Sequence, residues 1–129
     1  LSGMAGDRLP IVVSHGEGRA DFGLDGQGGE TGTGTTDALA ARMAAAHPAL
    51  RFVDGLGQAT ETYPLNPNGS PQGVTGFASA DGRATIMMPH PERVFRLAQW
   101  SWAPRELRDS GLDHSPWMRL WHNARRQFG

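Results

Sequence analysis

Residues 74–93 read VTGFASADGRATIMMPHPER. The runs 74–78 and 83–88 have the composition of β-strands, and Asp81-Gly82 lies between them. Both turn residues tolerate the positive φ angles that a type I′ turn requires, so this stretch predicts a β-hairpin. The second strand leads directly into Pro89-His90-Pro91-Glu92-Arg93. The sequence therefore predicts a loop with ionisable side chains at the end of a hairpin strand.

Short helices and strands are predicted on both sides of this hairpin. A β-branched apolar run over 9–13 predicts a buried strand that ends in the loop Ser14-His15-Gly16-Glu17-Gly18. A helix is expected over 38–46, capped by Thr36 or Asp37 and ended by Pro48, and strands are expected at 50–53 and 60–63. Ser115-Pro116 predicts the start of a C-terminal helix that packs through an apolar stripe formed by Trp117, Leu120, Trp121, Ala124 and Phe128.

The composition excludes several kinds of chemistry. The 129 residues suffice for one modest domain, and they include no Cys; all 12 basic residues are Arg, so Lys is absent as well. The chain therefore supplies no disulfide, thiolate nucleophile, Schiff base or P-loop ammonium. A net charge of −1 gives no sign of nucleic-acid or membrane binding, and no apolar stretch is long enough to span a membrane, so a cytoplasmic protein is expected. Because the first residue is Leu1, we expect a piece of a longer protein.

The segment 23–36 is rich in Gly and Thr and contains one large apolar residue, Leu24, which predicts a flexible surface loop. Within it, residues 29–36 have a glycine spacing similar to that of a phosphate-binding loop. Thr35 stands where such a loop needs Lys, however, so nucleotide binding is not expected there.

The candidate chemistry lies in His90-Pro91-Glu92. Pro91 keeps His90 out of the α region and gives a rigid connection between an imidazole and a carboxylate. A carboxylate that binds one ring nitrogen leaves the other free to act as a base toward a nucleophile, as in a catalytic triad. The alternative is a structural loop histidine or an ion pair of Glu92 with Arg93. The five histidines have no close ligand spacing, and without Cys no metal site is expected.

Four motifs, in this order along nearly the whole chain, carry a resemblance to a known family. They resemble the C-terminal part of the glutamine amidotransferase domain of the large, single-chain phosphoribosylformylglycinamidine synthases. The motifs are PIVVSHGEGR at 10–19, NPNGS at 66–70, MMPHPERV at 87–94, and the ending from Pro116-Trp117-Met118 to Asn123-Ala124-Arg125-Arg126.

The resemblance implies a partial class I amidotransferase domain of α/β, flavodoxin-like fold, with a mixed sheet, a β-hairpin and a C-terminal helix. Residues 1–129 would be its C-terminal portion, without the part that bears the nucleophilic Cys, and so inactive in isolation. His90 would be the catalytic base and Glu92 its orienting partner. Ser14, His15 and Gly16 would line the glutamine pocket.

The resemblance also implies partners. These are glutamine, the remainder of the same domain and a synthetase domain that uses ATP and magnesium; no cofactor is expected in residues 1–129. Self-association is also a possible partner interaction, because a half-domain exposes an open sheet edge and part of its core. Two alternatives stay open: a non-catalytic docking module of the same fold, and the small glutaminase subunit of a multi-subunit synthase.

Overall fold

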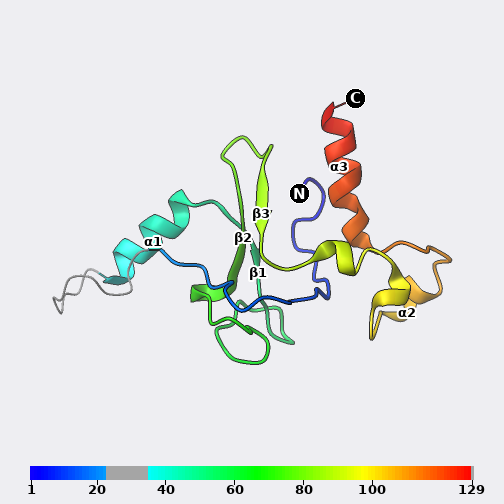
Figure 1. Ribbon diagram of the computed structural model, residues 1–129, viewed down its shortest axis with the longest axis horizontal. Helices are drawn as coiled ribbons and strands as arrows, with labels where there is room; N and C mark the ends of the chain where they lie inside the picture. The colour runs from blue at the N-terminus through cyan, green and yellow to red at the C-terminus, as the bar shows by residue number, and fades with distance from the viewer. Residues whose placement is uncertain (23–34, 129) are drawn as a thin grey trace. The chain divides into compact units, whose positions relative to one another are not determined.

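The computed structural model describes residues 1–22 and 35–128 (Figure 1). The chain divides into two units, one formed by Leu1–Ser14 with Pro89–Gly129 and the other by His15–Met88. Most of the expected loop at 23–36 lies outside the described residues. Its last two residues belong to a helix.

A three-stranded antiparallel sheet forms the centre of the second unit. Its strands are β1 (Pro48–Arg51), β2 (Val74–Ala78) and β3 (Thr85–Met87), in the order β1-β2-β3 (Figure 1). In the β2–β3 pair, Phe77 lies opposite Ile86. The predicted hairpin is confirmed, whereas β1 begins two residues before the predicted strand 50–53, and residues 60–63 form no strand.

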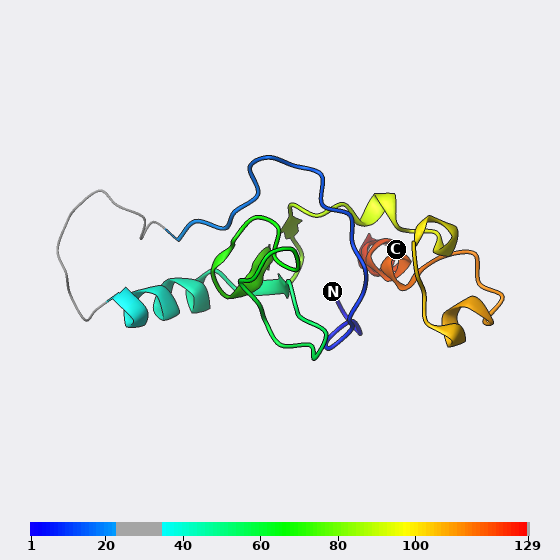
Figure 2. The same ribbon diagram turned by 90° about the horizontal axis from the view of Figure 1, so that it is seen from below.

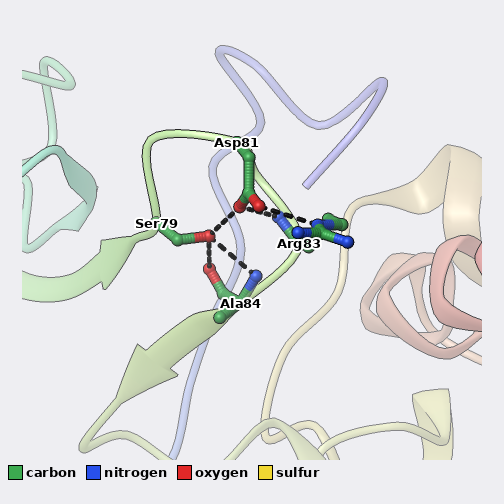
Figure 3. Close-up of polar contacts among 4 residues, drawn as sticks. All are labelled: Ser79, Asp81, Arg83 and Ala84. Carbon is green, nitrogen blue, oxygen red and sulfur yellow. Dashed lines mark hydrogen bonds and ion pairs between the residues drawn. The ribbon is translucent and has the colours of Figure 1, made fainter.

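The hairpin turn differs from the predicted type I′ turn. Among the described residues of this turn only Gly82 has a positive φ, of 69°, and its N–H donates to the carbonyl of Ser79 at 2.8 Å. Ser79 Oγ lies 2.6 Å from Asp81 Oδ1 and accepts from the N–H of Ala84, while Arg83 Nε donates to Asp81 Oδ2 at 2.7 Å (Figure 3). The turn thus needs only one left-handed residue because side chains supply the remaining bonds.

The core of this unit lies where β2 meets the segment after β1. Val74 is fully buried and Phe52 is 8% exposed. Gly73, at φ 71°, allows the two backbones to approach, since a Cβ there would lie 2.5 Å from the carbonyl oxygen of Phe52. The helix α1 (Thr35–Ala45) begins earlier than predicted, so Thr36 and Asp37 lie inside it and neither is its N-cap.

The other unit consists of short helices around the first fourteen residues. Its helices are η2 (Pro91–Arg93), η3 (Leu97–Gln99), α2 (Arg105–Arg108), η4 (Pro116–Met118) and α3 (Arg119–Phe128). Ser115 caps η4 as predicted, because its hydroxyl accepts from the N–H of Trp117. Trp117 is buried, and its indole N–H donates to the carbonyl of Pro10 at 2.8 Å. The predicted strand at 9–13 is reduced to one bridge, between Val12 and His90.

The expected packing of the C-terminal helix is wrong beyond its first turn. No residue of α3 is buried; Trp121 is 40% exposed and Phe128 86%. The helix is instead bonded to the N-terminal segment, from Asn123 Nδ2 to the carbonyl of Ser2 at 2.9 Å and from Arg119 to the carbonyl of Gly3. Figure 1 and Figure 2 show the N-terminal segment running beside α3.

The predicted α/β class, with its hairpin and C-terminal helix, is confirmed. Every strand pair in the described sheet is antiparallel, so these residues supply none of the parallel pairs of the expected mixed sheet. Within the part of the chain that the structure describes, no helix has the length and apolar character needed to cross a membrane.

Candidate functional site

His90 is held by its backbone at the point where two segments of the first unit meet. Its N–H donates to the carbonyl of Val12 at 2.8 Å. Its φ of −108° and ψ of 82° lie outside the α region, as expected for a residue before Pro91. Pro91 then opens the short helix η2, which contains Glu92. The main chain therefore presents the two side chains from adjacent, constrained positions.

The imidazole of His90 and the carboxylate of Glu92 are bonded directly. His90 Nδ1 lies 2.8 Å from Glu92 Oε1, and the two side chains are 29% and 56% exposed, respectively. Because an ionised carboxylate can only accept, Nδ1 carries the proton in this bond. The remaining nitrogen of a neutral ring, Nε2, is then an acceptor. This arrangement can take a proton at Nε2 while Glu92 stabilises the imidazolium.

Two hydrogen bonds keep Glu92 ionised. Its own backbone N–H and, to a smaller extent, the bond from His90 lower the pKa of Glu92 below its ordinary value of 4.5. The carboxylate therefore stays charged at and below neutral pH. The pairing with His90 is present above the ordinary pKa and is lost only as the pH falls through the lowered one.

The residues expected to line a glutamine pocket lie in both units. Ser14 is exposed and belongs to the first unit, two residues after the Val12–His90 bridge. His15 and Gly16 open the second unit, and Gly16 is exposed with no atom within 4 Å of the position of a Cβ. The structure thus brings His90 and Glu92 together in the first unit, whereas His15 and Gly16 belong to the second.

His15 has an unusual environment. Its two ring nitrogens are buried without a hydrogen-bond partner among the described residues. The ring lies against the backbone of Gly18, where a Cβ would come within 1.7 Å of His15 Cε1. Position 18 therefore requires glycine for steric reasons rather than for its φ angle.

Two polar residues that contact this segment belong to the NPNGS motif at 66–70, for which a structural role in turns and contact with substrate or the synthetase domain were both open, and neither is among the predicted site residues. Asn68 and Ser70 bond to the backbone of Gly18 and Ala20, 50 residues earlier in the chain. In the sequence, their position in a Pro- and Gly-rich stretch indicates a turn, but it does not indicate which segment the two side chains bind.

In the described part of the chain, the histidines do not gather with acidic residues into a metal site. Among the described residues there is no group of three or more His, Cys, Asp and Glu side chains that could hold a metal ion. His114 and His122 do approach each other, edge to face, with ring centroids 6.0 Å apart.

A histidine oriented by a carboxylate has the chemistry to exchange protons with a nucleophile supplied from elsewhere. The family model of the CobB/CobQ-like glutamine amidotransferase domain matches residues 1–128. The chain belongs to this family, whose substrate is glutamine and whose activity is amido transfer from it.

Proposed function

We propose that residues 1–129 supply the acid–base pair of the glutaminase site of a phosphoribosylformylglycinamidine synthase. The family match supports a glutamine amidotransferase domain, and the four motifs in order support this particular synthase. The observation that carries the proposal is the 2.8 Å contact between His90 Nδ1 and Glu92 Oε1. Amidation of formylglycinamide ribonucleotide, in de novo purine biosynthesis, would take place in another domain of the same protein.

The proposed reaction needs a cysteine from outside these residues, since the chain contains none. The thiol attacks the side-chain amide carbon of glutamine while Nε2 of His90 accepts the thiol proton. The imidazolium, stabilised by Glu92, returns that proton to the departing ammonia. Water then hydrolyses the thioester, which releases glutamate and regenerates the thiol.

ATP and magnesium belong to the amidation step in the proposed synthetase domain. No step derived for His90 and Glu92 passes through either of them. In the intact protein the ammonia released here would be the nitrogen source for that domain.

The proposal is tested by His90→Ala in the intact protein. Synthesis that depends on glutamine should fall by roughly a thousandfold, because both proton transfers lose their carrier. Synthesis supported by free ammonia should continue, since it bypasses the glutaminase site. Both activities are measured as formation of the amidine product with saturating ATP.

His122→Ala is the matched control, because it removes an exposed imidazole from α3 and leaves the His90–Glu92 pair intact. Loss of both activities in His90→Ala would show a structural role for His90. Retention of both would support the non-catalytic docking module instead.

A further inference from the structure

The segment that follows the Ser14–Gly18 loop is held by two side chains from a distant turn. Asn68 Nδ2 donates to the carbonyl of Gly18 at 2.6 Å. Two residues later, the N–H of Ala20 donates to Ser70 Oγ at 2.9 Å. Bonds on both sides of residue 19 fix the position and the direction of this backbone.

Asn68 and Ser70 are also bonded to each other. The hydroxyl of Ser70 donates to Asn68 Oδ1 at 2.9 Å, so its own oxygen is left to accept from Ala20. This bond assigns the amide of Asn68, because its oxygen must face Ser70 and its nitrogen must face Gly18. The amide nitrogen of Asn68 is therefore the donor to Gly18, and the oxygen of Ser70 is the acceptor for Ala20.

The turn that carries these side chains is itself anchored in the interior. Ser70 is fully buried and Asn66 is 2% exposed. Asn66 Nδ2 donates to the carbonyls of Ser70 and Thr60, at 2.9 and 3.0 Å, and its Oδ1 accepts from the N–H of Ser70. Because these buried groups are satisfied, the turn is a firm support for whatever it binds.

The position of the Gly18 backbone affects the ring of His15. Its ring rests on Gly18, whose carbonyl is the group that Asn68 binds. The ring makes no hydrogen bond to a described residue, since neither ring nitrogen has a partner there. The orientation of His15 therefore depends on where the Gly18 backbone is held.

We propose that Asn68 and Ser70 are positioning residues that hold the backbone at Gly18 and Ala20 and thereby fix His15 in the glutamine-binding loop. The effect on glutamine rests on the proposed function of that loop. The effect on His15 does not, and it can be measured separately.

The test uses Asn68→Asp and Ser70→Ala in the intact protein. Asn68→Asp keeps an acceptor for Ser70 but places a carboxylate oxygen 2.6 Å from the carbonyl of Gly18. Ser70→Ala leaves the N–H of Ala20 without its acceptor. Ser79→Ala is the matched control, because it also removes a hydroxyl that accepts a backbone N–H, that of Ala84 at 3.0 Å, but in the hairpin turn.

The first readout is the rate at which diethyl pyrocarbonate modifies His15, followed by peptide mass spectrometry. The buried ring nitrogens should react slowly in the unsubstituted protein and about tenfold faster in both variants, as expected for loss of one hydrogen bond. The second readout is glutamine kinetics, in which KM for glutamine should rise while ammonia-dependent synthesis and kcat stay near their original values.

Unchanged modification of His15 in both variants, or an equal increase in Ser79→Ala, would overturn the proposal. Faster modification with an unchanged KM for glutamine would support the positioning of His15 and contradict glutamine binding by this loop. A general loss of stability would also speed the modification of His90, whose side chain is 29% exposed and bonded to Glu92, and that result would overturn a specific role for Asn68 and Ser70.

Discussion

Gly18→Ala should disturb one loop by an amount that the structure defines. A Cβ at position 18 would lie 1.7 Å from Cε1 and 2.1 Å from Nδ1 of His15. Carbon atoms pack at about 3.5–4.0 Å, so the ring would have to move by roughly 2 Å. Forced shifts of this kind cost about 1–3 kcal/mol. The whole penalty is steric, because Gly18 has no positive φ.

The penalty can be read from amide hydrogen exchange at Ala20, whose N–H is bonded to Ser70 Oγ. When closing is faster than exchange, the exchange rate follows the free energy of local opening. A loss of about 1–3 kcal/mol corresponds to an increase of roughly 5- to 150-fold. Peptide-resolved mass spectrometry of the intact protein measures this rate.

Gly16→Ala is the matched control in the same loop. No atom lies within 4 Å of a Cβ at position 16, and its φ is not in the left-handed region. Alanine should therefore change the exchange of Ala20 by no more than about twofold, or slow it slightly by restricting the unfolded chain. Equal exchange in Gly18→Ala and Gly16→Ala would refute the contact of the His15 ring with Gly18.

Two predictions concern the turns of the chain. The hydrogen bond from Ser79 and, to a smaller extent, those from Arg83 lower the pKa of Asp81 from 3.8 to about 2. The contribution of these contacts to stability is therefore fully present above pH 3.8 and is lost as the pH falls through about 2. Ser79→Ala should move the carboxylate midpoint, measured by NMR, back toward 3.8, and an unmoved midpoint would contradict this cause. Ser115→Ala should speed exchange of the Trp117 amide roughly tenfold, since the hydroxyl caps that N–H and also donates to Val94, and unchanged exchange would show that the cap contributes nothing.

Local features were predictable from the sequence because the interacting residues are close along the chain. The hairpin joins strands separated by one short turn, and the Ser115 cap binds an N–H two residues ahead. The turn type was not predictable from Asp81-Gly82 alone. It depends on side-chain bonds from Ser79 and Arg83, which satisfy the turn without a second left-handed residue (Figure 3).

The packing of α3 was not predictable in the same way. Periodicity identifies an apolar stripe on a helix, but it does not identify the surface that covers the stripe. Trp117 is covered because its indole reaches Pro10, 107 residues earlier in the chain. Trp121 and Phe128, at the same helical spacing, remain exposed among the described residues.

The two parts of the candidate site also differ in how far apart along the chain their interacting residues lie. His90 and Glu92 are two residues apart, and Pro91 restricts the backbone between them, so their pairing follows from a three-residue motif. His15 is oriented through Gly18, which depends on Asn68, 50 residues away. Substitutions at 90 and 92 should therefore act on proton transfer, whereas substitutions at 68 should act on the placement of the loop. The first effect appears in kcat and the second in KM for glutamine, so kinetics can separate residues that the family match alone treats alike.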